Sequence, residues 1–342
     1  MPHTQGSHSL NDANRLGLDY RLESSELPYE EPIWDVHTHV QSVKSAEMML
    51  AAMDAYGVEK IWSMSNLEIV PDLKRIFGDR IEFIAVPNFS EKDEEGTFTT
   101  DWYRRIEKFA ECGTKICKFW AAPRGIDFDP SFAIDHPSRR TAMDIARDCG
   151  MMFMTHVGDP DTWFATHYRD KQKYGTKADH LAALETMLDV YDDVTWIAAH
   201  MAAQPEHLDV LQGVLDRHPN LYLDTSATKW MVRELSRHPK EFSDFCERNQ
   251  GRVMFGSDIV TSDENIDFDL YASRYWSLRT MYETDYDGLS PIVDPDLVML
   301  SPEKGDKQTA DLRGASMPNE LLDVVYHNAA KELLMPLYEA AV

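Results

Sequence analysis

The 342-residue sequence has few cysteines, and their spacing fits neither a disulfide framework nor a zinc knuckle. The four are Cys112, Cys117, Cys149 and Cys246, and no two of them form a CxxC or a zinc-knuckle spacing. A small secreted domain held by disulfides needs a framework of paired cysteines, which this pattern does not provide. We therefore expect reduced thiols, buried by default, in a cytoplasmic protein.

The chain also lacks long apolar runs and an excess of positive charge. No uncharged apolar stretch is long enough to cross a bilayer, and residues 1–31 lack the apolar core of a signal peptide. With 34 basic and 59 acidic residues, the formal net charge is −25. Such a chain has no sequence-independent attraction to nucleic acid or to an anionic membrane, so we expect neither as a partner.

What the sequence does contain is an alternation of short apolar segments and helical patterns. The eight strand candidates are residues 32–40, 60–66, 81–89, 114–121, 151–158, 194–201, 221–228 and 252–260. Helical patterns between them include residues 45–57, 101–113, 138–150 and 205–219, and several end at Gly or Pro. This alternation predicts a parallel sheet with helices packed outside it.

Eight strand–helix units of roughly 30 residues fit a closed (β/α)8 TIM-type barrel of about 250 residues with insertions. An open doubly wound sheet is the rival fold, but its GxGxxG signature after the first strand is absent. We divide the chain into a polar N-terminal arm (1–31) and a barrel (32–342) with an insertion after the eighth strand (261–317). Within the insertion we expect a helix at 267–283, while polar residues 301–314 fit either an ordered or a disordered segment.

The first strand, "IWDVHTHV", closes on two imidazoles. Residues i and i+2 of a strand share a face, so His37 and His39 point the same way. Taken alone, such a pair is also satisfied by carbonyl groups or water. The pattern nevertheless suits a metal, because imidazole nitrogens are common ligands of divalent transition ions.

Three further strands end on a residue that can bind metal. The fifth closes on His156, the sixth on His200 and the eighth on Asp258. Barrel closure brings the strand ends around a single mouth, so all five side chains are expected to converge there. Imidazoles and a carboxylate suit Zn²⁺, Mn²⁺ or Fe²⁺, with a position left open for water or substrate in a catalytic site.

The set of motifs resembles a known family. The order of "HTH", two strand-closing histidines and "GSD" resembles the amidohydrolase superfamily, most closely its amidohydrolase-related branch. That branch includes aminocarboxymuconate-semialdehyde decarboxylase and pyrone-dicarboxylate lactonase. The terminal "VVYHNAAKELL" (324–334) is similar to the branch's closing helix. The resemblance specifies a superfamily and leaves the reaction open.

The resemblance implies roles for the five residues. His37, His39 and His156 would bind one divalent metal, zinc or else manganese or iron, with Asp258 as a further ligand or the acid/base residue. His200 would lie beside the metal and orient the substrate or a water. Two-metal members of the superfamily bridge their ions with a carboxylated lysine that closes the fourth strand, near Lys118, but we favour a single ion.

The expected activity is metal-dependent hydrolysis of an amide, ester or lactone bond in a small, carboxylate-bearing molecule. A metal-activated water would attack while Asp258 moves the proton. The alternative enzyme is a decarboxylase of a small aromatic or unsaturated acid, and a barrel that binds metal without catalysis is a third reading.

Further residues are candidates for contact with the substrate. They are Arg124, Lys118, Trp163, His167 and Trp230, with Tyr168 and Lys229 beside them in sequence. Arg124 is chosen because a guanidinium group can bind a carboxylate through two parallel hydrogen bonds. Related enzymes are often homo-oligomers, and the insertion at 261–317 is a candidate contact surface by analogy.

Overall fold

The computed structural model of the chain describes residues 10–339. It divides into two compact units. Unit 1 comprises Met1–Ile61 and Thr225–Lys331, and unit 2 comprises Trp62–Asp224 and Glu332–Val342. Residues 1–9 of the predicted N-terminal arm lie outside the described residues.

Unit 2 contains a run of parallel strands. In order of pairing these are β3 (Ile81–Ala85), β4 (Ile116–Ala121), β5 (Met152–Val157), β6 (Trp196–Ala198) and β7 (Leu221–Asp224). Nearly every residue of β4 and β5 is buried, as expected for parallel strands that are covered on both faces. The chain boundary between the units falls inside β2 (Val58–Ser63).

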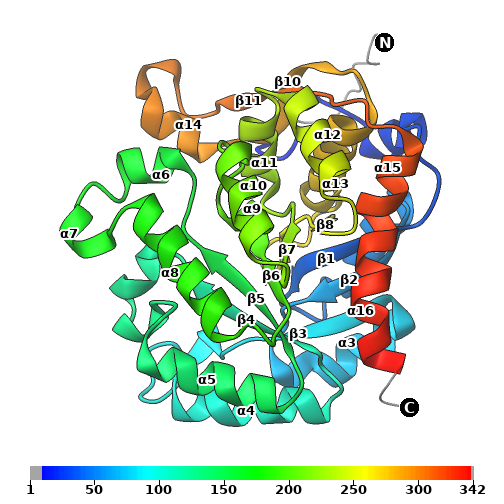
Figure 1. Cartoon of the computed structure of the whole chain (residues 1–342). Coiled ribbons are helices and arrows are strands. Elements are labelled where there is room, and N and C mark those ends of the chain that lie inside the picture. Colours follow the sequence, from blue (N-terminus) through cyan, green and yellow to red (C-terminus); the bar gives the residue numbers. More distant parts are fainter. Residues whose placement is uncertain (1–9, 340–342) are drawn as a thin grey trace. The chain divides into compact units, whose positions relative to one another are not determined.

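The helices of unit 2 follow its strands in sequence. They are α3 (Val70–Phe77), α4 (Thr100–Glu111), α5 (Pro137–Asp148), α6 (Asp161–Thr166), α7 (Lys171–Tyr174), α8 (Lys177–Val190), α9 (Ala199–Ala202) and α10 (Leu208–Arg217). Figure 1 shows α4, α5 and α8 alongside β3–β5. Helix α8 begins with a capping box in which Thr176 and Asp179 satisfy each other's backbone N–H groups.

Unit 1 contains the strand that carries both imidazoles. Its strands are β1 (Ile33–Val40), β8 (Val253–Met254), β9 (Ile259–Thr261), β10 (Asp287–Val293) and β11 (Thr309–Arg313). Strand β1 pairs in parallel with β9, and β10 pairs antiparallel with β11. The single strand predicted at 252–260 is split into β8 and β9, because residues 255–258 form no strand and Asp258 has a left-handed backbone.

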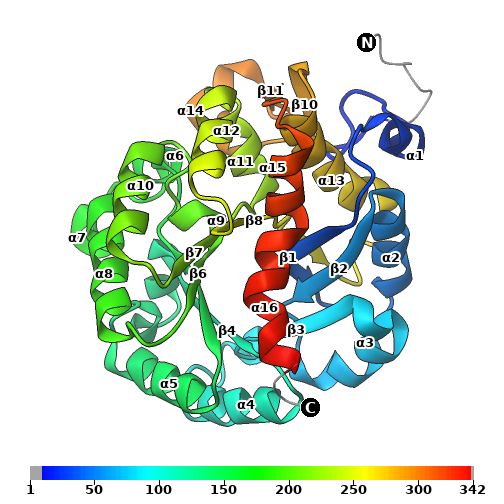
Figure 2. The same cartoon turned by 45° about the vertical axis from the view of Figure 1, so that its right-hand side comes forward.

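The helices of unit 1 are α1 (Tyr20–Glu23), α2 (Ala46–Ala55), α11 (Thr228–Leu235), α12 (Pro239–Arg248), α13 (Phe268–Glu283), α14 (Pro295–Leu300) and α15 (Asn319–Asp323). A π-helical turn, Val324–Asn328, joins α15 to α16 (Ala329–Glu339), which continues into unit 2. Figure 2 shows α13 next to α2.

Residues 261–317, the predicted insertion, contain helices α13 and α14 and strands β10 and β11. Helix α13 begins one residue after the predicted start and ends at the predicted residue. Residues 301–314 contain a short 3₁₀ turn, Pro302–Lys304, and strand β11, which fits the ordered alternative. The arm packs against the insertion, because Arg15 N donates to Pro291 O at 2.8 Å and Val293 N donates to Asp12 O at 2.8 Å.

Two other predictions concern the burial of the cysteines and the presence of helices that could cross a membrane. Cys117 and Cys246 are buried as expected, whereas Cys112 is exposed. None of the helices within residues 10–339 combines the length and hydrophobicity that crossing a bilayer requires.

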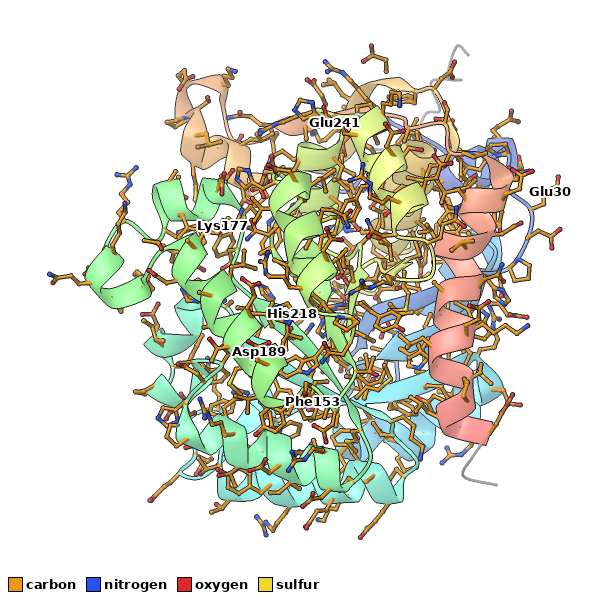
Figure 3. All side chains as sticks on the ribbon, in the orientation of Figure 1. Glu30, Phe153, Lys177, Asp189, His218 and Glu241 are labelled. Atoms are coloured by element: carbon orange, nitrogen blue, oxygen red, sulfur yellow. The ribbon has the colours of Figure 1, made fainter. Side chains whose placement is uncertain are left out.

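His218, which has no strand-end position, has a structural role in unit 2. Its Nε2 lies 3.2 Å from Glu185 Oε1, and its Nδ1 lies 3.5 Å from Asp189 Oδ1. Figure 3 shows His218 and Asp189, together with Lys177 at the other end of α8. The histidine thus joins α8 to the end of α10.

Candidate metal centre

Three of the predicted ligands lie together in unit 1. Nε2 of His37 is 3.4 Å and Nε2 of His39 is 3.1 Å from Oδ1 of Asp258. One ligand atom from each residue lies within 4.8 Å of the others. His37 is buried, while about a quarter of each of the other two side chains is exposed. Two imidazoles and a carboxylate at this spacing fit a divalent transition ion.

Backbone geometry between β8 and β9 brings Asp258 to this position. Its φ is 59°, in the left-handed region, which is uncommon for residues other than glycine but which aspartate tolerates better than most. Its N–H donates to His37 O at 2.8 Å. At Gly256 an added Cβ would lie 3.0 Å from His37 Cβ and 3.1 Å from Ser226 Cβ, so a side chain there would require His37 or Ser226 to shift.

A hydrogen-bond network orients His37. Ser226 Oγ lies 2.9 Å from Nδ1 of His37, which leaves Nε2 facing Asp258. Asp35, two residues earlier in β1, is fully buried and accepts from His37 N, from both donors of Ser257 and from Tyr275 OH. Burial raises the pKa of Asp35 to about 7, although these hydrogen bonds oppose the shift. Such outer partners fix the orientation of metal-ligating side chains.

The other two predicted histidines lie together in unit 2. The ring centroids of His156, on β5, and His200, after β6, are 4.5 Å apart, with the ring planes at 81°. His200 starts a run of four left-handed residues, 200–203, with φ between 52° and 57°. Its N–H donates to Asp224 Oδ1 at 3.0 Å. Left-handed backbone at residues other than glycine is costly and clusters at functional sites.

His156 has a polar partner that sequence reasoning missed. Its Nε2 lies 2.9 Å from Oδ1 of Asp159, a buried carboxylate that also accepts a hydrogen bond from Tyr168 OH. No spacing rule signals this arrangement, because Asp159 follows the strand in a loop. The same holds for Ser226, whereas Asp35 could have been found by its period-2 relation to His37 and His39.

Most of the candidate substrate residues lie in unit 2. The Arg124 guanidinium is 5.9 Å from the ring centroids of both Trp120 and Trp163. Trp163 also contacts the His167 ring, with centroids 4.6 Å apart. Lys118 is buried on β4, two residues before Trp120, and the two share a face of that strand. Trp120 pairs in register with His156, so these aromatic and cationic groups lie near that histidine.

The remaining candidate, Trp230, lies in unit 1. Its Nε1 donates to Asp296 Oδ2 at 3.1 Å, so the indole packs towards α14. The structure thus gathers His37, His39 and Asp258 in one unit, and His156 and His200 in the other.

A family model described as "Amidohydrolase" matches residues 93–331, more than half of the chain. No curated protein sequence matches the chain significantly.

Solved structures resemble this one at low sequence identity. A probable 2-pyrone-4,6-dicarboxylic acid hydrolase from Acinetobacter baumannii, with citric acid bound, has a TM-score of 0.51 and 10% identity, covering 88% of this chain and 98% of its own. An uncharacterised TIM-barrel protein from Bordetella bronchiseptica has a TM-score of 0.50 and 11% identity, covering 89% and 99%. These two similarities confirm the predicted (β/α)8-barrel fold and show nothing beyond the fold.

Proposed function

Because the chain belongs to the amidohydrolase family, which identifies it as an enzyme, we propose that it is a metal-dependent hydrolase. Its substrate would be a small, carboxylate-bearing molecule with an amide, ester or lactone bond. The observation that carries the proposal is the group of donor atoms of His37, His39 and Asp258 within 4.8 Å. That donor set suits the ion that the family resemblance implies.

We propose that one divalent ion is held by His37, His39 and Asp258, with His156 as the ligand that the sequence resemblance adds from unit 2. Zinc is our first choice, and manganese and iron are the alternatives. When bound, such an ion would polarise the scissile carbonyl and lower the pKa of a water molecule.

The chain's own residues would position the reactants and move the proton. Asp258 would take the proton from the attacking water and return it to the leaving group. The left-handed turn and the hydrogen bond from Asp258 N to His37 O support this role, because they fix the carboxylate beside both imidazoles. His200 would orient the substrate or the water, and Arg124 would bind an anionic group of the substrate.

Decarboxylation is the second candidate reaction, and one observation favours it. The Asp258 side chain is 29% exposed, so it is accessible to a substrate as well as to water. In that case Asp258 would deliver a proton to carbon as CO₂ leaves a small aromatic or unsaturated acid. The donor set itself serves both reactions.

A paired screen separates the two reactions. Lactones, esters and amides would be tested for release of acid, and aromatic or unsaturated acids would be tested for release of CO₂. We expect hydrolysis that is lost in His37→Ala. Release of CO₂ alone would select the decarboxylase, and no turnover in either panel would favour a binding protein without catalytic activity.

We further propose that the protein works in the cytoplasm on a small molecule and binds neither nucleic acid nor membrane, in line with its acidity and free cysteines. Homo-oligomer formation through residues 261–317 stays a prediction. Size-exclusion chromatography with light scattering measures the mass in solution and tests it.

A further inference from the structure

Two cationic side chains of unit 1 have no carboxylate partner within residues 10–339. Lys229 is the second residue of α11, and Arg274 lies in the middle of α13, the helix that packs against α11. Both are partly buried. Arg274 donates from Nη1 to Ser273 Oγ at 2.9 Å, a neutral partner. In a chain with 59 acidic residues, two unpaired cations on adjoining helices require an explanation.

The carboxylates nearest to Arg274 are engaged with other groups. Asp258 and Asp267 both favour its charged form electrostatically. However, Asp258 lies against the two imidazoles of β1, and Asp267 caps α13 by accepting from Asp269 N at 3.0 Å. Neither forms an ion pair with Arg274.

The carboxylates near Lys229 are also engaged with another group. Asp294 and Asp296 attract its charge, but both are hydrogen-bonded to the buried Arg233 guanidinium. Arg233 itself repels Lys229 and so offsets part of that attraction. No acidic group within the described residues forms an ion pair with Lys229.

Keeping both cations charged has a cost in free energy. Burial first, and then the nearby charge of Arg274, lower the pKa of Lys229, and burial lowers the pKa of Arg274 to about 10. Two like charges with incomplete hydration repel each other more strongly than they would in water. An anion bound by both would remove the repulsion and supply the missing hydrogen-bond acceptors.

Hydrogen bonds connect helices α11 and α13 to the segments that carry the candidate metal ligands. Thr228, next to Lys229, donates from Oγ1 to Ser257 O at 2.8 Å, and Ser257 precedes Asp258. Tyr275, next to Arg274, donates from its hydroxyl to Asp35 Oδ2 at 3.1 Å. Figure 2 shows α11 and α13 in the same part of unit 1. These contacts tie α11 and α13 to the segments that carry Asp258 and His37, and Asp258 acts electrostatically on Arg274.

We propose that Lys229 and Arg274 form an anion subsite that binds a carboxylate group of the substrate beside the metal centre. A guanidinium can hold a carboxylate through two parallel hydrogen bonds, and the ammonium adds a point charge. The subsite deepens the proposed hydrolase and rests on it for the nature of the ligand. It selects acids over neutral analogues of the same shape.

The test uses the full chain and isothermal titration calorimetry with benzene-1,3-dicarboxylate, and with its neutral diamide for comparison. Protein as purified and protein treated with chelator are both titrated, which separates binding by the two cations from binding by a metal. The variants are Lys229→Met and Arg274→Met, with Lys229→Arg and Arg274→Lys as charge-preserving partners. Lys240→Met is the matched control, because that exposed lysine on α12 pairs with Asp244.

We expect the dicarboxylate to bind wild type more tightly than the diamide, with or without metal. Each methionine variant should weaken its binding about tenfold, a loss of 1.4 kcal/mol, while Lys229→Arg and Lys240→Met stay near wild type. Arg274→Lys keeps the charge but loses the paired hydrogen bonds, so its affinity should fall between those of wild type and Arg274→Met. Equal affinity in wild type and both methionine variants, or no binding to wild type at millimolar concentration, would overturn the subsite. If Arg274→Met does not fold, the dicarboxylate affinities of Lys229→Met and Arg274→Lys, compared with that of wild type, decide whether the subsite exists.

Metal analysis of the same samples keeps the two proposals apart. If the protein contains metal and neither methionine substitution changes its dicarboxylate affinity, the subsite is contradicted and the hydrolase proposal is not. If the purified protein contains no metal but both methionine substitutions weaken dicarboxylate binding, the hydrolase proposal is contradicted and the subsite is supported.

Discussion

Oδ1 of Asp258 lies 3.1 Å from Nε2 of His39. The contact joins the end of one strand to a residue more than 200 positions away in sequence. Asp258 has a left-handed backbone, and Gly256, two residues earlier, lies close to His37 and Ser226. The carboxylate is thus fixed next to the imidazoles by the backbone, which prepares the site for a ligand before the ligand arrives.

Replacing Asp258 with Asn tests the proton-transfer role. Asn has nearly the same shape but cannot take a proton from water. Turnover on the best substrate of the paired screen should fall by about 10²–10⁴, the usual range for loss of a general acid/base. Circular dichroism should show an unchanged fold. Turnover at the wild-type level would assign the proton transfer to another group.

Replacing Ser226 with Ala tests the orientation of His37. The hydroxyl lies 2.9 Å from Nδ1, so its loss frees the ring to rotate. We expect metal affinity, measured by competition with a chromophoric chelator, to fall by about 10–100-fold. Ser236→Ala is the control, because that buried hydroxyl contacts only Met281 Sδ, at 3.9 Å, among its hydrogen-bond partners in residues 10–339. Equal affinities in the two variants would count against the positioning role.

Replacing Tyr168 with Phe tests the partner of His156. The hydroxyl donates to the buried carboxylate of Asp159, so its loss leaves that carboxylate without one of its donors. We expect the free energy of unfolding to fall by about 1–3 kcal/mol in chemical denaturation. Tyr174→Phe, which removes an exposed hydroxyl contact with Asp127, should change it by less than about 0.5 kcal/mol. Similar losses in both variants would contradict this account.

The parts of the site that follow a simple period were predictable from the sequence. The period of two in β1 identified the shared face of His37 and His39, and helical periodicity found α13 to within one residue. The left-handed residues were not predictable. His200, Met201 and Asp258 adopt the left-handed conformation, which is uncommon for residues other than glycine, so local sequence does not identify these positions.

The electrostatic surroundings of Arg274 and Lys229 were not predictable from the sequence either. The sequence shows that Arg274 and Lys229 exist, but not that α11 and α13 pack together or that nearby acids are engaged elsewhere. Hydrogen-bond partners such as Ser226 and Asp159 stand in loops where no periodicity applies. Such partners depend on long-range packing, which local patterns do not encode.

A further prediction concerns the pH dependence of stability in unit 2. The buried Arg105 guanidinium binds both carboxylate oxygens of Glu68 and lowers the pKa of that group below its ordinary value of 4.5. A lowered pKa means stabilisation that is present above 4.5 and is lost as the pH falls through the folded-state pKa. The difference in melting temperature between wild type and Glu68→Gln should therefore be largest near pH 7 and shrink below pH 4.5. A difference that grows on acidification would show that the pairing is misassigned.

The most direct test of the account is the metal content of the purified chain, measured by elemental analysis in wild type and in His37→Ala, His39→Ala and His156→Ala. The account predicts about one divalent transition ion per wild-type chain. His37→Ala and His39→Ala should lose the ion, and so should His156→Ala. A wild-type protein purified and reconstituted without bound metal, or single-site variants that keep full occupancy, would contradict it.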